Sequence, residues 1–243
     1  MRTFGPAHIS WLIGIALTAI LLSAACRTGR LPHRTVRLAL AFLLAAMECV
    51  RYAYLGFHFP NELPIHLCTI TVWTLVISSF TLTPSAIEFG YFAGFAGGGM
   101  ALLTPDAGTQ WPARFFITHG AIIVLASVLV YGRDFSVTVR GLWRSIGIAL
   151  AYFFSIGVFD ALFGVNYMYM CRKPPGPSAM DLMGPWPNYL GACILVLFGL
   201  FLALWIPVRP KRSRSGVSAI EDPPTLFAPQ HLEGLSAEQR ERR

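Results

Sequence analysis

Seven long runs of apolar residues divide this chain, and they limit its fold more than any other feature. Each run approaches the length of about 20 residues that an α-helix needs to cross the hydrocarbon core of a bilayer. Only 13% of the residues are charged, whereas soluble domains carry about 25%. We therefore exclude a soluble enzyme and predict an all-α bundle of seven transmembrane helices. The helices are expected at roughly residues 8–26, 38–57, 64–82, 87–104, 114–131, 145–164 and 187–207.

The first run could be mistaken for a signal peptide, because Leu22-Ser23-Ala24-Ala25-Cys26 resembles a lipoprotein cleavage site. A cleavable signal peptide carries its positive charges before the apolar run. Here Arg2 alone precedes the run, and four arginines follow it: Arg27, Arg30, Arg34 and Arg37. We therefore expect an uncleaved first transmembrane helix.

The distribution of basic residues predicts the orientation of the helices. Lys and Arg accumulate in the cytoplasmic segments of membrane proteins. With the N-terminus outside, the outer segments hold only Arg2, Arg114, Arg172 and Lys173. The cytoplasmic segments then hold the arginines after the first run, the group Arg133, Arg140 and Arg144, and the cluster that begins at Arg209. We predict an N-out/C-in protein of the plasma membrane.

The chain turns polar from about Lys211 and there has too few apolar residues to fold. We expect residues 1–207 to form the transmembrane domain and residues 208–243 to form a disordered cytoplasmic tail. Its first basic residues are expected to contact anionic head groups.

A glycine stripe marks the fourth run, where Gly90, Gly94 and Gly98 follow one another at four-residue spacing. Such a stripe lets two helix backbones approach closely. Close packing is therefore predicted here, and a hinge or a substrate groove is the alternative.

Polar side chains fall at one depth, in the outer half of the bundle, once the helix directions are taken into account. They are Glu48, Arg51, His66, Cys68, Thr104, Asp106, Arg114, Thr118, His119, Asp160, Asn166, Tyr167 and Lys173. A charge at the bilayer centre costs about 2.5 kcal/mol or more. The pattern favours a shared polar cavity that opens to the extracytoplasmic side. The alternative is a structural pair, Glu48 with Arg51, surrounded by interfacial residues.

Cys68 is the candidate nucleophile in this group. On a regular helix His66 and Cys68 point about 200° apart and cannot both face one point. An imidazole for Cys68 would then come from another helix, and His119 is the candidate. A helix N-terminus, an imidazole or an arginine favours the thiolate, which is the nucleophilic form. A buried inert thiol and a disulfide with Cys171 are the alternatives.

The segment between the last two runs is rich in aromatic residues, prolines and cations. Arg172 and Lys173 would suit the binding of a phosphate. They would equally suit an anchor to the lipid surface, with no catalytic role.

Five short motifs carry a resemblance to a known family. They are Pro64-x-His66-Leu67-Cys68, Leu103-Thr104-Pro105-Asp106, Arg114-Phe115-Phe116-x-x-His119-Gly120, Asn166-Tyr167-x-Tyr169-x-x-x-Lys173-Pro174 and Asp181-x-x-Gly184-Pro185-Trp186-Pro187-x-Tyr189. In this order, over about residues 40–207, the chain resembles YwaF-type bacterial integral membrane proteins, which are similar to the animal transmembrane protein 164 family. Animal members are described as cysteine-dependent acyltransferases that move fatty acyl chains between phospholipids. The resemblance implies that Cys68 carries the acyl group and that His119 is its base.

Three functions fit this pattern. The first is a cysteine-dependent phospholipid acyltransferase. The second is a transporter or binding protein for a small polar or anionic solute, in which Glu48 and Asp160 titrate, although the chain shows no internal repeat of the kind common in transporters. The third is a receptor-like or scaffold protein.

The candidate catalytic residues are Cys68, His119 and His66. The candidate substrate-binding residues are Glu48, Arg51, Thr104, Asp106, Arg114, Asn166, Tyr167 and Lys173. The five cysteines show no C-x-x-C spacing, so we expect no metal ion and no cofactor. The expected partners are membrane lipids, including a phospholipid or acyl substrate, and no nucleic acid is expected.

Overall fold

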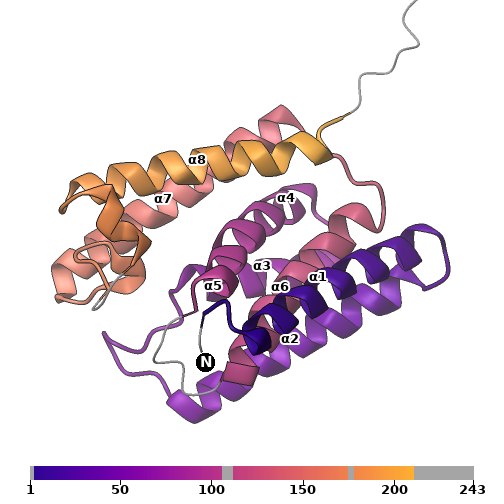
Figure 1. The fold of residues 1–243 in the computed structure, drawn as a ribbon, viewed down its shortest axis with the longest axis horizontal. Coiled ribbons are helices and arrows are strands. Elements are labelled where there is room, and N and C mark those ends of the chain that lie inside the picture. The colour runs from indigo at the N-terminus through magenta and orange to yellow at the C-terminus, as the bar shows by residue number, and fades with distance from the viewer. Residues whose placement is uncertain (1–2, 106–111, 175–177, 211–243) are drawn as a thin grey trace, which may run out of the picture. The chain divides into compact units, whose positions relative to one another are not determined.

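The computed structural model describes residues 3–105, 112–174 and 178–210, and the regular elements in those ranges are all helices (Figure 1). The predicted all-α class is confirmed for this part of the chain. Asp106 and the polar tail from Lys211 lie outside the described residues.

The helices follow the apolar runs closely. They are α1 (Pro6–Arg27), α2 (His33–Leu55), α3 (Leu67–Thr81), α4 (Pro84–Ala93), the π-helix η1 (Gly94–Gly98), α5 (Gly99–Leu103), α6 (Pro112–Tyr131), α7 (Val139–Phe163), the short 3₁₀ helices η2 (Tyr167–Tyr169) and η3 (Ala179–Met183), and α8 (Asn188–Val208). Because α4, η1 and α5 are continuous, they act as one helix that extends to Leu103.

Six of these helices are long and apolar enough to cross a membrane: α1, α2, the continuous helix α4–η1–α5, α6, α7 and α8. The chain is therefore a multi-pass membrane protein by helix length and composition. The predicted third span is present as α3, but its 15 residues reach only about 22 Å at 1.5 Å per residue. It ends where Leu82 adopts a left-handed conformation and Thr83, before Pro84, is biased away from the helical region. The seventh crossing stays a prediction.

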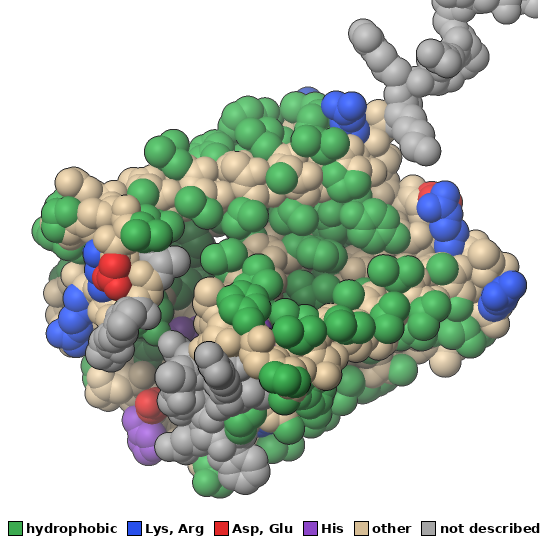
Figure 2. Space-filling view, viewed as in Figure 1, with side chains coloured by type: hydrophobic (Ala, Val, Ile, Leu, Met, Phe, Trp, Pro, Cys, Tyr) green, Lys and Arg blue, Asp and Glu red, His purple; other side chains and the backbone are tan. Residues whose placement is uncertain are grey.

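Two helices lie at the centre of the bundle. In the apolar stretches of α6 and of α4–η1–α5, 72% and 61% of the residues are buried, against 17% to 22% for α1, α2, α7 and α8. The outer helices leave large apolar side chains exposed. Figure 2 shows these side chains as a broad hydrophobic band, with Lys, Arg, Asp and Glu gathered toward the two ends. This is the surface that a membrane-embedded bundle needs.

The glycine stripe brings α4 and η1 against α3 and α6. A methyl group added at Gly90 would lie 2.7 Å from Leu75 of α3, and one at Gly94 would lie 3.2 Å from Ile122 of α6. The close packing predicted for this stripe is confirmed.

Candidate functional site

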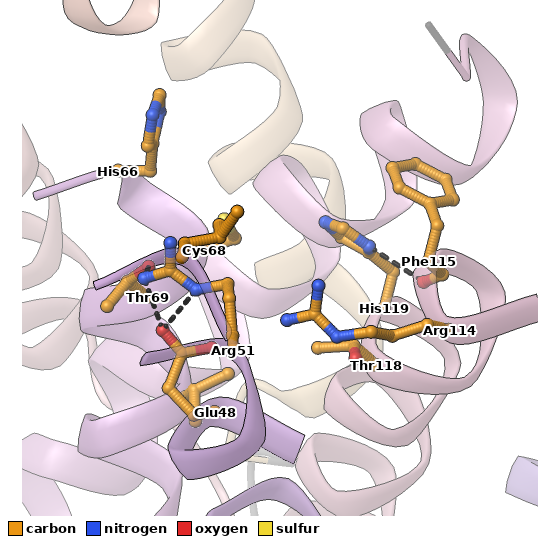
Figure 3. A pocket seen from close by; sticks show the side chains of 11 residues that line it. Glu48, Arg51, His66, Cys68, Thr69, Arg114, Phe115, Thr118 and His119 are labelled. Atoms are coloured by element: carbon orange, nitrogen blue, oxygen red, sulfur yellow. Dashed lines mark hydrogen bonds and ion pairs between the residues drawn. The ribbon is translucent and has the colours of Figure 1, made fainter. Parts of the chain in front are cut away.

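A cavity of about 300 Å³ lies between α2, α3 and α6. Its lining residues are Glu48, Arg51 and Leu55 of α2, His66, Cys68, Thr69 and Val72 at the start of α3, and Arg114, Phe115, Thr118 and His119 of α6. Figure 3 shows Cys68 and the Glu48–Arg51 pair on one side, with Arg114, Thr118 and His119 on the facing side. Six predicted site residues therefore line one cavity: Glu48, Arg51, His66, Cys68, Arg114 and His119.

The start of α3 positions Cys68. The backbone of His66 is extended, and the first residue of the helix is Leu67. Cys68 is therefore in the first turn, where backbone N–H groups lack intrahelical partners and favour negative charge. His66 and Cys68 would point apart only if the helix were regular through His66, and the extended backbone of His66 removes that condition. Both residues line the cavity.

Hydrogen bonds from two tyrosines hold the segment that precedes α3. The Tyr167 hydroxyl accepts a hydrogen bond from the Leu63 amide and donates one to the Pro60 carbonyl, both at 2.8 Å. The Tyr152 hydroxyl of α7 donates to the Ile65 carbonyl at 2.5 Å. The ring of Tyr167 also packs edge-on against His66, with 5.0 Å between centroids. These contacts fix the entry to α3 and thereby the position of Cys68.

The predicted ion pair between Glu48 and Arg51 is present. Glu48 Oε1 accepts hydrogen bonds from Arg51 Nε at 3.0 Å and from Nη2 at 2.7 Å. Nη2 also lies 3.4 Å from the Thr69 hydroxyl, next to Cys68. The pair therefore links α2 to the first turn of α3, and the charge of Arg51 is neutralised by a carboxylate.

His119 has a defined donor and acceptor arrangement. Its Nδ1 lies 2.9 Å from the Phe115 carbonyl oxygen. A carbonyl oxygen only accepts, so Nδ1 carries the proton and Nε2 is the acceptor nitrogen of the neutral ring. Figure 3 shows this second nitrogen turned toward the side of the cavity where Cys68 lies. His119 is thus arranged to take a proton inside the cavity.

Arg114 contributes a second guanidinium to the cavity. Its Nε is buried without a hydrogen bond, and so is the hydroxyl of Thr118 one turn later. Within the described residues no carboxylate forms an ion pair with Arg114. Because Glu48 already pairs with Arg51, the described residues of the lining carry an excess positive charge at Arg114.

All five cysteines are free. The disulfide considered between Cys68 and Cys171 is therefore absent. Cys68 is half-buried, and Cys171 lies in the segment after η2. Among the described residues, no group of three or more His, Cys, Asp or Glu is arranged to hold a metal ion.

Four predicted substrate-binding residues lie outside the cavity lining. Thr104 is exposed at the end of α5, and its hydroxyl donates to the Met100 carbonyl. Asn166 binds the backbone of residues 171 and 172 through its amide group. Lys173 Nζ lies 3.5 Å from Asp181 Oδ1. The Tyr167 hydroxyl bonds the backbone of the segment before α3, as described above. Asn166, Tyr167 and Lys173 therefore order the chain segments near α3 and between α7 and α8, Thr104 bonds its own helix, and the fifth residue, Asp106, lies outside the described residues.

Sequence reasoning missed the apolar part of the site. Leu55, Val72 and Phe115 line the cavity, but nothing in the sequence separates them from side chains that face lipid or core. Thr118 was predicted at this depth and lines the cavity, and Thr69 could have been found because it directly follows Cys68.

A model of the TMEM164 family matches residues 3–205. This range includes every residue that lines the cavity. Comparison with curated proteins and comparison with solved structures find no match. The family match does not distinguish subgroups, so the narrower YwaF-type grouping stays a prediction. The chain belongs to the TMEM164 family, as its motifs predicted.

Proposed function

We propose that this protein transfers fatty acyl groups between membrane lipids, with Cys68 as the acyl-carrying nucleophile. One observation carries the proposal. A cysteine in the first turn of a helix shares a cavity with an imidazole whose acceptor nitrogen faces inward and with a guanidinium that has excess charge. These are the groups that thioester chemistry on an anionic lipid needs.

The first half of the reaction loads the enzyme. His119 Nε2 takes the proton from the Cys68 thiol, and the thiolate attacks the ester carbonyl carbon of a donor phospholipid. The C–S bond forms and the C–O bond breaks. The imidazolium of His119 then returns the proton to the leaving lipid oxygen, which departs as a lysolipid alcohol.

The second half transfers the acyl group to an acceptor. The hydroxyl of a lysolipid gives its proton to His119 Nε2 and attacks the thioester carbon. The new C–O bond forms, the C–S bond breaks, and the Cys68 thiolate recovers the proton from His119. Atoms and charges balance without a cofactor. The backbone amide of Cys68, which has no acceptor in the described chain, is suited to stabilise the oxyanion in both halves.

The cavity favours a phospholipid over a neutral lipid. Arg114 would bind the phosphate of the head group, since a guanidinium matches phosphate oxygens in pairs. Leu55, Val72 and Phe115 give the cavity an apolar wall for the start of an acyl chain. A volume of about 300 Å³ holds only part of a phospholipid, so the rest of the acyl chains would stay in the bilayer.

We place the site in the outer leaflet of the plasma membrane, in a bundle of seven crossings with the N-terminus outside. The support is electrostatic. The cavity lies at the end of the bundle where α2 ends and α3 and α6 begin, whereas the opposite end carries the arginines of the first loop. Lys and Arg concentrate on the cytoplasmic side of membrane proteins.

An acyl-transfer assay in proteoliposomes tests the proposal. The donor carries an alkyne-tagged fatty acid, the acceptor is a lysophospholipid, and the product is the tagged phospholipid. Cys68→Ala should abolish transfer, and His119→Gln should slow it by about a hundredfold or more. Cys49→Ala removes an exposed thiol of α2 outside the cavity and should leave the rate unchanged. Transfer by Cys68→Ala at the wild-type rate would exclude the mechanism.

The same assay assigns the base. Two imidazoles line the cavity, and His66 packs against Tyr167. If His119 is the base, His66→Gln should keep most of the activity. A larger loss of activity in His66→Gln than in His119→Gln would identify His66 as the base.

A binding protein or transporter for a small anion is the second candidate, and the excess charge at Arg114 favours it. Two observations count against proton coupling through the residues expected to titrate. Glu48 is paired with Arg51, and Asp160 is buried on α7 and does not line the cavity. Saturable phosphate uptake into proteoliposomes that survives in Cys68→Ala and fails in Arg114→Gln would favour this second function.

A further inference from the structure

A second group of cations lies at the opposite end of the bundle from the cavity. There α1 ends, α2 begins and α6 ends, and the three termini are in contact. A methyl group added at Gly132 would lie 3.2 Å from Cys26 and 3.3 Å from His33. The imidazole Nε2 of His33 lies 3.2 Å from the Val128 carbonyl. We call the cations gathered here, Arg34 and Arg37 of α2 and Arg133 after α6, the inner basic cluster.

Arg37 is the unusual member of this cluster. Its side chain lies on the buried face of α2, one turn before Ala41, and is only 8% exposed. Its Nε and Nη1 are buried and have no hydrogen bond. Buried charges in proteins are normally paired and hydrogen-bonded. The guanidinium of Arg37 is therefore buried without an anionic partner among the described residues.

The charged groups around Arg37 do not neutralise its positive charge. The charges that act on it are those of Arg133 and Arg34, and both are positive. The nearby acid, Asp134, already forms an ion pair with Arg27 at 2.8 Å, and both of these side chains are more than half exposed. Within the described residues, no carboxylate forms an ion pair with any member of the inner basic cluster.

The start of α2 adds a further attraction for an anion. The residue before the helix is Pro32, no side chain caps the helix, and its first turn contains no acidic residue. The N–H groups of such a turn and the helix dipole favour negative charge. Arg34 and Arg133 are exposed, so an anion can reach the cluster from the surface.

The geometry points to a binding site for a phosphate oxyanion at the inner basic cluster, with the head group of an anionic phospholipid as its source. The cluster lies at the start of α2, a candidate membrane span, and hence at head-group depth. Arginine binds phosphate oxygens in pairs and is weakly hydrated, which suits a partly buried site. In the proposed orientation the cluster faces the cytoplasmic leaflet, where anionic lipids are concentrated. The site is separate from the cavity and needs no reaction at Cys68.

The test measures lipid binding to the purified full-length protein by native mass spectrometry and by the shift in Tm. Micelles doped with phosphatidylglycerol are compared with micelles doped with phosphatidylcholine. The wild type should retain phosphatidylglycerol and gain thermal stability from it. Arg37→Gln should weaken this binding about tenfold or more, because a charge-assisted contact is lost. The control is Arg140→Gln, which removes the same charge from an exposed position at the start of α7 and should bind as the wild type does.

Two further measurements cover a variant that does not fold and the source of the bound anion. If Arg37→Gln does not fold, the exposed pair Arg34→Gln and Arg133→Gln replaces it, and the double variant should lose the same preference. Inorganic phosphate is tested alone. A phosphate-induced rise in Tm equal to that of phosphatidylglycerol, absent from the cluster variants, would keep the anion site but overturn the lipid as its source. Equal retention of phosphatidylglycerol by the cluster variants and by Arg140→Gln would overturn the site itself. Acyl transfer is not the readout, so failure of this site leaves the proposed function intact.

Discussion

Replacing Glu48 by Gln removes the carboxylate that neutralises Arg51 and should destabilise the bundle. Glu48 is buried, with 4% of its side chain exposed, and the side chain of Arg51 is 20% exposed. In the variant the guanidinium stays charged, because arginine does not lose its proton in proteins. The neutral amide offers Arg51 a weaker acceptor than the carboxylate did.

The size of the effect follows from the burial of the pair. Removing one partner of a buried ion pair costs about 3–5 kcal/mol. Arg51 lines a cavity, and water there screens part of its charge, so we take the lower end of the range, about 3 kcal/mol. For a chain of this size 1 kcal/mol moves Tm by about 2–4 °C, and the expected fall is therefore about 6–12 °C. Replacing both residues by Met should recover most of this loss, because no charge is then left buried.

Thermal unfolding of the purified protein in one detergent, followed by intrinsic tryptophan fluorescence, measures this prediction. Glu62→Gln is the control, since Glu62 is exposed outside the helices. Its Tm should match that of the wild type. If Glu48→Gln also unfolds within about 2 °C of the wild type, the pair is hydrated and the reasoning from burial is refuted.

Three further predictions follow from the packing and from the segments near α3 and between α7 and α8. Gly90→Ala should cost about 1–3 kcal/mol, because its methyl group would press on Leu75, whereas helical Gly99→Ala meets nothing within 4 Å and should keep or slightly raise the wild-type Tm. Tyr167→Phe removes both hydrogen bonds to the segment before α3, and acyl transfer should fall below the wild-type rate; a rate equal to that of the wild type would show that Tyr167 does not position the site. The Ser178 backbone amide, and then Lys173, hold the pKa of exposed Asp181 below its ordinary value of 3.8. Asp181 should therefore stabilise the loop above that value, so proteolysis of the wild type and of Asp181→Asn should differ at about pH 6 and converge as the pH falls through the lowered pKa.

The sequence predicted the helices better than their ends. The exact start of a helix determines which polar side chains are buried. The apolar runs located every long helix, because lipid requires continuous apolar stretches. The start of α2 was predicted near residue 38, which left Arg37 in a loop. The helix begins at His33 and turns Arg37 onto the buried face. A shift of a few residues thereby changes an interfacial cation into a buried one.

The candidate site was also predicted only in part. Depth along the helices brought Glu48, Cys68 and His119 to one level, and they line one cavity. Depth carries no information about rotation or about loop structure. His66 was assigned to a regular helix, although its backbone is extended, and Asn166 was expected at the substrate although its amide group binds its own loop. Such contacts depend on tertiary structure, which a single sequence does not reveal.

The most direct test of the central claim is the intact mass of the purified protein after incubation with a phospholipid that carries an isotopically labelled acyl chain. We predict an added mass of one acyl group, located by peptide mapping on Cys68 and removed by hydroxylamine, as a thioester requires. Cys68→Ala should acquire no adduct, and Cys193→Ala should acquire it as the wild type does. An adduct that persists in folded Cys68→Ala, or that maps to another cysteine in the wild type, would contradict the assignment of Cys68 as the nucleophile.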